Sequence, residues 1–343
     1  NKRFNLQQAT DSQAHTLPRV VVLATGGTIA STLPNEQALA QDYAVSHEAG
    51  DLLSAVPQAG QLANLHCIDL LALPSHDIGN PELLKIAHAV QTWLDKDDIA
   101  GVVITHGTDS LEETAYFLNL VVRTSKPIVI TGAMRPADHL SPDGPANLLE
   151  AIAVAASPLS IGKGVLVVMN DAIMEARACS KQHSSSMATF NAGAAAQIGE
   201  VYGSDVVYNT TPLKRHTSSS EFAVSNLHSL PVVDIIYDYQ SARYNLYEAA
   251  VDSGCAGIVI AGMGNGSLSP AAHRGAEYAK EHGVVVVRAS RCGRGVVSPL
   301  AMDEELQSIP GNSLNPQKAR ILLMLALAHG AGREQLLRQF FEY

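Results

Sequence analysis

Short, unbroken runs of Val and Ile alternate with helix-like patterns along most of the chain. Continuous apolar strands, rather than alternating ones, are typical of a parallel sheet that is covered on both faces. The helical segments between them are what parallel strands need as connections. The alternation therefore predicts an α/β fold with a mainly parallel sheet flanked by helices. The expected strands are 20–25, 101–105, 127–131, 164–169, 232–237, 257–261 and 284–289, and the expected helices are 81–94, 110–123, 144–156, 270–282 and 316–329.

A polar, Ser- and Thr-rich stretch bounded by prolines interrupts this rhythm at 211–231. Such a composition is typical of a linker between domains. We therefore expect a larger N-terminal domain over 19–210 and a smaller C-terminal α/β domain over 232–343. Residues 1–18 are polar and aperiodic, which predicts a loosely ordered tail.

Composition argues against several classes of protein. The chain is 46% hydrophobic and 16% charged, with a formal net charge of -10, so it lacks the basic patch of a typical nucleic-acid binder. No run approaches the roughly 20 apolar residues of a membrane span. The cysteines are widely spaced and form no C-x-x-C pair, which argues against a structural zinc site, and free thiols are favoured over disulfides. They are Cys67, Cys179, Cys255 and Cys292.

The sequence begins with Asn1 rather than Met, which leads us to expect that a segment upstream has been removed. Together with the polar tail, this start favours an exported, periplasmic protein. Free cysteines are equally at home in the cytoplasm, which stays open as the alternative compartment.

The first expected strand ends in TGGTIA, residues 25–30, where a glycine turn carries two threonines. Ligands bind beyond the carboxyl ends of strands in open parallel sheets, so a hydroxyl at this turn is placed to face a substrate. The glycine patterns of dinucleotide sites and P-loops are absent, which disfavours a phosphate cradle. Taken alone, the motif is equally compatible with a catalytic loop and with a strand-exit turn whose threonines bond to the backbone.

A second strand exit repeats this pattern in THGTDSLEE, residues 105–113. Ser110 with Glu113, or Asp109 with Glu112, has the spacing of a helix capping box. Capping does not account for the histidine, glycine and threonine that precede these residues. Backbone N–H groups at such a turn can stabilise an oxyanion, as acyl transfer requires. The motif is therefore a second candidate for part of a catalytic site.

Other polar residues have both a structural and a functional interpretation. Tyr43 lies in a small, polar stretch that is compatible with a mobile lid or with a plain surface loop. Lys181 can serve as a base when desolvated and is otherwise a solvated lysine. Ser75 and Asp77 have the positions of turn and cap residues, and Glu305 that of a surface helix charge. A threonine nucleophile needs a base nearby, and the sequence offers candidates for this base without showing which of them lies beside the threonine.

These motifs resemble those of the bacterial type II L-asparaginases and the related glutaminase-asparaginases. ATGGTIA and THGTDSLEETAYFL are similar to the family's two signature motifs, and the resemblance extends from about Arg19 to Tyr343. Further similar stretches are GAMRP at 132–136, SPDGPANLLEA at 141–151, GVLVVMND at 164–171, AGMGNGS at 261–267 and SLNPQKARILLMLAL at 313–327.

The resemblance implies hydrolysis of L-asparagine to L-aspartate and ammonia through an acyl-enzyme, with some L-glutamine turnover. It assigns the nucleophile to Thr28, which attacks the side-chain amide carbon. Tyr43 assists the activation of this threonine, together with Glu305 contributed by a neighbouring subunit. Glu304 is the alternative for that glutamate.

A second group is implied to lie across the substrate and to position or activate water. It consists of Thr108, Asp109 and Lys181. Two alternatives stay open: a glutamine-preferring amidohydrolase, and a non-catalytic amino-acid-binding protein on the same scaffold. The presence of the whole group argues against the second.

The resemblance also implies the contacts that bind the substrate. Ser75 grips the α-carboxylate, Asp109 binds the α-ammonium, and Ser267 reaches the site from a neighbouring subunit. His76 departs from the family, which has Gln or Glu there in contact with the substrate's amino group. A neutral imidazole accepts a hydrogen bond, whereas a protonated one repels an ammonium. We therefore expect His76 to affect substrate affinity and its pH dependence.

By the same resemblance, the expected assembly is a homotetramer built from intimate dimers with active sites shared between subunits. The expected partner is a small amino-acid amide, and neither nucleic acid nor a membrane is expected. No metal or organic cofactor is implied, and the thirteen histidines show no H-E-x-x-H or similar spacing.

Overall fold

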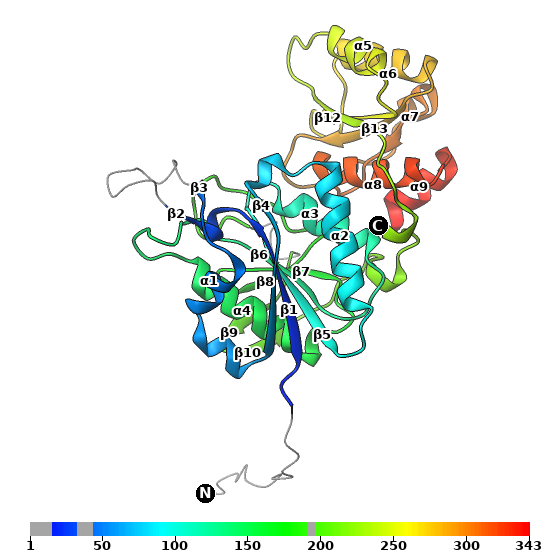
Figure 1. Ribbon diagram of the computed structural model, residues 1–343. Helices are drawn as coiled ribbons and strands as arrows, with labels where there is room; N and C mark the ends of the chain where they lie inside the picture. The colour runs from blue at the N-terminus through cyan, green and yellow to red at the C-terminus, as the bar shows by residue number, and fades with distance from the viewer. Residues whose placement is uncertain (1–15, 33–43, 191–195) are drawn as a thin grey trace, which may run out of the picture.

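The computed structural model describes residues 16–32, 44–190 and 196–343, and Figure 1 shows two α/β units of unequal size. The larger, N-terminal unit has an eight-stranded sheet in the order β10-β9-β8-β7-β6-β5-β1-β4. The strands from β4 to β7 in this order are parallel, and β8, β9 and β10 extend the sheet in antiparallel pairs. Their bounds are β1 Arg19–Gly26, β4 Asn64–Leu73, β5 Ile99–Thr105, β6 Ile128–Thr131, β7 Val165–Met169, β8 Ala172–Glu175, β9 Gln197–Tyr202 and β10 Asp205–Tyr208.

The smaller, C-terminal unit has a four-stranded parallel sheet in the order β11-β12-β13-β14. The predicted fold class is therefore confirmed in both units, because each is built on parallel strands connected by helices. A further short antiparallel pair, β2 with β3, follows β1. The bounds are β2 Ser31–Thr32, β3 Ala44–Val45, β11 Val233–Tyr237, β12 Gly257–Gly262, β13 Val285–Ser290 and β14 Ile309–Pro310.

Helices cover both faces of each sheet. In the larger unit α2 and α3 pack on one face, while α4 and the short α1 pack on the other. In the smaller unit α5 and α6 cover one face and α8 the other. The bounds are α1 Ala49–Ser54, α2 Asn80–Leu94, α3 Leu111–Val121, α4 Gly144–Ala156, α5 Asn245–Asp252, α6 Pro270–Glu281, α7 Ala301–Leu306, α8 Pro316–Ala328 and α9 Arg333–Glu342.

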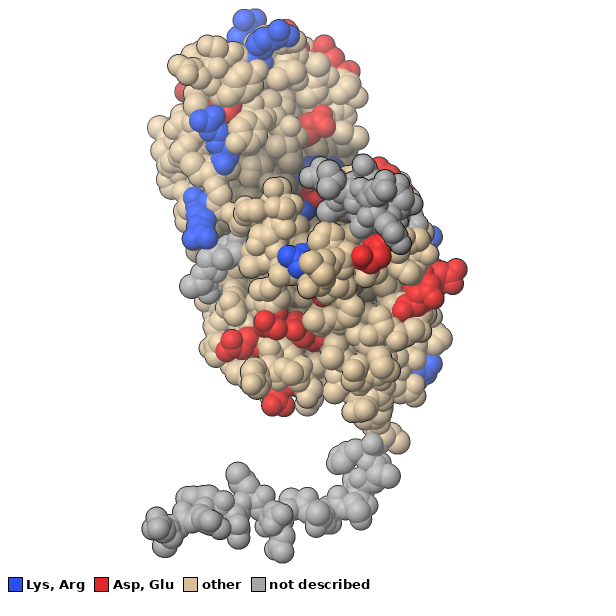
Figure 2. Space-filling model, turned by 90° about the vertical axis from the view of Figure 1, so that its left-hand side faces the viewer, with Lys and Arg blue, Asp and Glu red and all other residues tan. Residues whose placement is uncertain are grey.

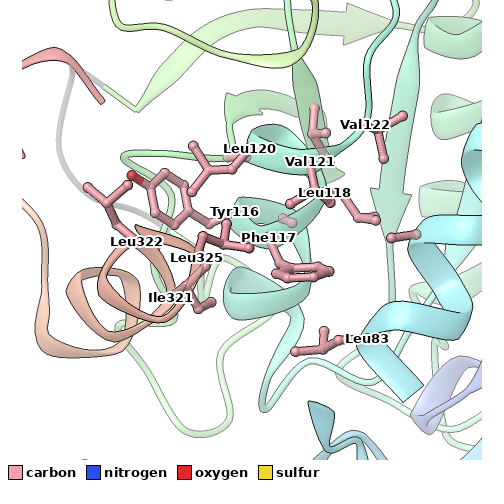
Figure 3. Packing of buried hydrophobic residues seen from close by; sticks show 14 of the residues in the cluster. Leu83, Tyr116, Phe117, Leu118, Leu120, Val121, Val122, Ile321, Leu322 and Leu325 are labelled. Atoms are coloured by element: carbon pink, nitrogen blue, oxygen red, sulfur yellow. The ribbon is translucent and has the colours of Figure 1, made fainter. Parts of the chain in front are cut away.

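The two units share one continuous apolar core where α8 of the smaller meets α3 of the larger. Figure 3 shows Tyr116 of α3 beside Leu322 of α8, with Ile321 and Leu325 close by. All of these side chains are buried. Burial of apolar surface at this contact stabilises the docking of the two units by roughly 25 cal/mol per Å² removed from water.

Every strand and helix predicted from the sequence is present, with ends within two residues of those expected. The edge strand β4 was not predicted, because it is half exposed and mixes polar residues such as His66 and Asp69 with apolar ones. The antiparallel strands β8 to β10 and the helices α1, α5, α7 and α9 were also not predicted. Of the expected tail over 1–18, residues 1–15 lie outside the described part of the chain.

The segment expected to be a linker, 211–231, contains short 3-10 turns at Thr217–Ser219 and Val224–Asn226. Phe222 within it is fully buried, and its ring centroid lies 5.3 Å from those of both His329 and Tyr343. The segment therefore packs against the C-terminal end of the chain. The domain boundaries on either side of it stay a prediction.

On the face shown in Figure 2, the Lys and Arg side chains of the described residues are scattered among uncharged ones. Across the described ranges, no helix combines the length and apolarity needed to cross a membrane. Each of the four cysteines is a free thiol in the structure.

Candidate active site

The carboxyl ends of three neighbouring strands meet at one edge of the larger sheet. β5, β1 and β4 are adjacent in the sheet, and the segments that follow them enclose a cavity of about 380 Å³. Ligands of open parallel sheets bind at this edge, so the cavity is the candidate active site. It is lined by Gly27, Thr28, Ser31, Ala72, Pro74, Ser75, His76, Gly107, Thr108 and Asp109.

Two glycines allow these strand exits to approach each other closely. Gly27 has a φ of 82°, and a Cβ added to it would lie 2.3 Å from the Gly107 Cα. A Cβ added to Gly107 would lie 2.7 Å from the Ser75 Oγ. Any side chain at either position would force the segments apart. The glycines therefore set the spacing of the polar groups around the cavity.

The two threonines of TGGTIA have different surroundings. Thr25 is fully buried, and its hydroxyl donates to the Thr105 carbonyl oxygen at 2.8 Å, which ties β1 to β5. Thr28 begins a short 3-10 turn, Thr28–Ala30, and is a buried residue that lines the cavity. The structural interpretation therefore applies to Thr25, whereas Thr28 borders the space that a substrate would occupy.

Lys181 reaches the second motif from a distant segment of the chain. Its Nζ donates to the Thr108 Oγ1 at 2.9 Å and to the Asp109 Oδ1 at 2.7 Å. The Lys181 side chain is only 16% exposed, whereas that of Asp109 is 62% exposed. The structure thus brings these three predicted residues together. A cation held beside a hydroxyl and a carboxylate can bind and orient a polar ligand or a water molecule.

Ser75, after β4, is buried and bonds to the beginning of α3. Its Oγ accepts the backbone N–H of Asp109 at 3.2 Å and of Ser110 at 3.4 Å. The expected capping box at this helix is wrong, because the N-cap residue Ser110 makes no side-chain cap hydrogen bond. Its hydroxyl donates instead to the Ser75 carbonyl oxygen at 2.6 Å. The helix start is therefore fixed by the neighbouring strand exit.

His76 lies at the rim of the cavity, with 67% of its side chain exposed. Its Nδ1 is 3.8 Å from the Asp109 Oδ2, and its Nε2 is 3.9 Å from the Asp77 Oδ1. The imidazole therefore stands between two carboxylates at the place where a positively charged ligand group would approach Asp109.

His106 is a residue whose function the sequence did not reveal. It is fully buried, and its Nδ1 lies 2.7 Å from the Gly107 carbonyl oxygen. A carbonyl only accepts, so Nδ1 carries the proton and Nε2 accepts from the Thr114 hydroxyl at 2.9 Å. Burial lowers the pKa of His106 to about 4, so the ring is neutral near pH 7. It fixes the strand exit that carries Thr108.

Three of the residues singled out from the sequence, Tyr43, Ser267 and Glu305, are not among the described residues that line this cavity. Tyr43 lies outside the described residues. Ser267 and Glu305 are exposed in the smaller unit and are not among the described residues that line the cavity. Glu304, the alternative to Glu305, is paired with Arg333 at 2.9 Å. Within one chain, Ser267, Glu304 and Glu305 therefore do not line the cavity that contains Thr28.

Three further lining residues were not singled out from the sequence. Ala72 lies at the end of β4 and Pro74 directly follows this strand, which was not predicted from the sequence. Ser31 donates its hydroxyl to the Gly27 carbonyl oxygen at 2.8 Å and so stabilises the turn that presents Thr28. In the described part of the chain, no group of three or more His, Cys, Asp or Glu residues is arranged to hold a metal ion.

Comparison with protein-family models identifies both units. Residues 19–214 match the model described as "Asparaginase, N-terminal", and residues 232–341 match the "Glutaminase/Asparaginase C-terminal domain". The first match alone covers more than half of the chain.

Characterised relatives are similar over nearly the full length. The chain is 44% identical to "L-asparaginase 2" of Bacillus subtilis, over 98% of this chain and 90% of that protein. It is 40% identical to "Probable L-asparaginase periplasmic" of Haemophilus influenzae, over 96% of this chain and 94% of that protein. It is 38% identical to "Glutaminase-asparaginase" of Pseudomonas fluorescens, over 98% of this chain and 94% of that protein.

Proposed function

The chain belongs to the asparaginase family, and on this premise we propose that it is an amidohydrolase that converts L-asparagine to L-aspartate and ammonia. L-Glutamine is a second substrate, since relatives of similar identity are named glutaminase-asparaginases. The observation that carries the proposal is the cavity that Thr28 lines together with Thr108 and Asp109, the two residues to which Lys181 bonds.

Thr28 is the nucleophile of the proposed reaction. Its Oγ1 attacks the side-chain amide carbon, the amide nitrogen takes up a proton and leaves as ammonia, and an acyl-enzyme ester remains. Water then attacks the ester, which releases L-aspartate and restores the hydroxyl. The position of Thr28 on the turn after β1, buried at the cavity wall, supports this role.

A threonine hydroxyl is a weak nucleophile until a base removes its proton. In the proposed mechanism Tyr43 and a neighbouring subunit's glutamate, Glu305, assist this step. Thr108 and Lys181 hold the water that hydrolyses the ester. The support for the second role is the pair of short bonds that Lys181 Nζ makes to Thr108 and Asp109.

Ser75 and Asp109 bind the two charged groups of the amino acid. The Ser75 Oγ already accepts two backbone N–H groups, which leaves its own hydrogen to donate to the α-carboxylate. Asp109 is largely exposed toward the cavity rim and pairs with the α-ammonium, where His76 also stands. An ammonium withdrawn from water needs such a partner.

The proposed assembly is a homotetramer of intimate dimers in which each site is completed by a second copy. Support comes from Ser267 and Glu305, which are exposed in the smaller unit instead of lining their own chain's cavity. We place the protein in the periplasm, as the name of the Haemophilus influenzae relative indicates for that protein.

Steady-state ammonia release from L-asparagine and L-glutamine tests this function. Turnover of both, with the higher kcat/KM for L-asparagine, is the expected result. A higher kcat/KM for L-glutamine would favour a glutamine-preferring amidohydrolase. Calorimetric binding of either amino acid without ammonia release would show a binding protein and contradict the proposal.

A further inference from the structure

A buried ion pair beneath Lys181 joins the two units of the molecule. Glu112 belongs to α3 of the larger unit and Lys318 to α8 of the smaller, and the Lys318 Nζ lies 3.7 Å from the Glu112 Oε2. Their side chains are only 6% and 2% exposed. The pair therefore crosses the same α3–α8 contact whose apolar part is seen in Figure 3.

The Glu112 carboxylate divides its bonds between the two units. Its Oε1 accepts the Ser180 hydroxyl at 3.0 Å and the Lys181 backbone N–H at 3.4 Å. Its Oε2 accepts the side-chain amide of Asn315 at 2.8 Å and faces Lys318. One carboxylate thus ties the beginning of α8 to the segment that carries Lys181.

Lys318 holds the same segment from the other side. Its Nζ donates to the carbonyl oxygen of Arg177 at 3.0 Å and to that of Cys179. The backbone of 177–181 is therefore fixed by side chains from two helices, one in each unit. Lys181, at the end of this segment, bonds to two of the residues that line the candidate active site.

Stability alone does not explain a buried ion pair at this position. Such pairs rarely stabilise a fold more than apolar residues of similar size, because desolvation of the charges offsets their attraction. The apolar contact between α3 and α8 already docks the units (Figure 3). What the ion pair and its hydrogen bonds add is a fixed backbone position for Lys181.

We propose that Glu112 and Lys318 are positioning residues that fix Lys181 against Thr108 and Asp109. Through them, the geometry of this group depends on the docking of the smaller unit. Glu112 lies in the first turn of α3, and Asp109 directly precedes the N-cap residue of this helix, so the start of α3 carries both Asp109 and the carboxylate that bonds to the segment of Lys181. The inference rests on the proposed function, since it takes Lys181 to act in amide hydrolysis.

A neighbouring ion pair offers a matched control. Arg320 of α8 and Glu113 of α3 join the same two helices, with Nη1 and Oε2 3.9 Å apart. The Arg320 Nε also donates to the Val233 carbonyl oxygen at 2.9 Å. Among the hydrogen bonds of the described residues, neither side chain contacts 177–181. Loss of this pair therefore weakens the helix contact without touching the segment of Lys181.

The experiment measures kcat and KM for ammonia release from L-asparagine, together with urea unfolding. It compares the parent, Glu113→Gln, and the double variant Glu112→Gln/Lys318→Met, which removes both charges and leaves neither buried alone. For the double variant we expect a kcat reduced about tenfold or more and a KM within about threefold of the parent's. Its unfolding midpoint should stay close to that of Glu113→Gln.

Ser180→Ala is a second, milder variant, because it removes one bond of Glu112 without unpairing a charge. It should lower kcat about threefold with little change in KM, in the same sense as the double variant. If the double variant does not fold, Ser180→Ala alone tests whether Glu112 positions Lys181.

A kcat equal to the parent's in the double variant would overturn the positioning role. If only Ser180→Ala folds, a parental kcat in that variant would overturn it. So would a loss of kcat that Glu113→Gln shares in equal proportion, since it would reflect weaker docking in general. If the parent and Glu113→Gln both fail to release ammonia, the proposed function itself is contradicted, and this inference with it.

Discussion

Asp109 lies between two side chains, Lys181 and His76, that approach its two carboxylate oxygens. Lys181 Nζ occupies Oδ1 at 2.7 Å, and His76 Nδ1 stands 3.8 Å from Oδ2. In the proposed function the substrate ammonium binds this same carboxylate. A protonated imidazole at Oδ2 both repels the ammonium and occupies its partner. His76 is therefore the residue at which we expect substrate affinity to respond to pH.

The variant His76→Gln tests this expectation. We expect its KM for L-asparagine to be roughly fivefold below the parent's at about pH 5.5, because an exposed ion pair is worth up to about 1 kcal/mol. At about pH 8 the two KM values should agree within about twofold, because a neutral imidazole does not repel the substrate ammonium. His139→Gln, a change of a half-buried histidine that does not line the cavity, is the control. Equal KM values for His76→Gln and the parent at both pH values would contradict the role of His76.

At the scale of elements, the sequence predicted strands and helices better than the site they form. The Val and Ile runs of β1 and β5 are buried on both faces, so their pattern is unambiguous. The edge strand β4 is half exposed, and without it Ser75 has no predicted place beside Thr28. The sequence therefore indicated two of the three strand exits that enclose the cavity.

The contact of Lys181 with Thr108 shows a second limit of prediction from sequence. The two residues are separated by 73 positions, and the contact depends on a non-repeating segment held by side chains of both units. Glu112 has the spacing of a capping residue, but its carboxylate is used in tertiary contacts instead. Local spacing does not encode such contacts. Here the family resemblance, and not the pattern of residues, linked Lys181 to the site.

The β5–α3 connection has its own pH dependence through His106. Burial lowers its pKa in the folded protein to about 4, while an unfolded histidine titrates near pH 6.5. As pH falls through this window, the unfolded state takes up a proton and the folded state does not, so stability decreases. The full effect is about 3 kcal/mol at low pH, since one pKa unit corresponds to about 1.4 kcal/mol. The variant His106→Gln should lack this loss in urea unfolding.

The pH dependence of the free energy of unfolding, measured for the parent and for His106→Gln, separates the effect of His106 from that of other groups. Burial, and a hydrogen bond that the protonated Glu150 carboxyl makes to the Asp171 carboxylate, raise the pKa of Glu150 to about 7, so this group gives the dependence of stability on pH a slope of the opposite sign. That slope is present in the parent and in His106→Gln alike and cancels in their difference. Parallel profiles between about pH 7 and about pH 4 would show that His106 is not a neutral, buried base.

At the scale of the whole molecule, the chain separates residues that the proposed function requires. Thr28 lines the cavity of the larger unit, whereas Glu305 is exposed on α7 of the smaller. Arg288, fully buried, bonds to Asp303 of α7 and to the carbonyl oxygen of Gly266, next to Ser267. One guanidinium thus organises the surface that we propose to complete the site of a second copy.

Sharing of sites between subunits predicts complementation between two inactive variants. Thr28→Ala and Glu305→Gln should each lose most of their activity alone. When the two are unfolded together and reassembled, roughly a quarter of the parental activity should return, since about half of the dimers are mixed and each carries one intact site of two. Reassembly of each variant by itself is the control. No recovery in the mixture would mean that Glu305 does not act in a neighbouring subunit.

The measurement that tests the central claim most directly is ammonia release from L-asparagine by Thr28→Ala and Thr25→Ala. Both threonines are buried in the same motif, but Thr25 bonds to Thr105 and Thr28 borders the cavity. We expect Thr28→Ala to fold like the parent and to lose at least about a thousandfold in kcat, as removal of a nucleophile does. Thr25→Ala should lose about 1 kcal/mol of stability and keep its turnover. Retained turnover in Thr28→Ala would contradict the account.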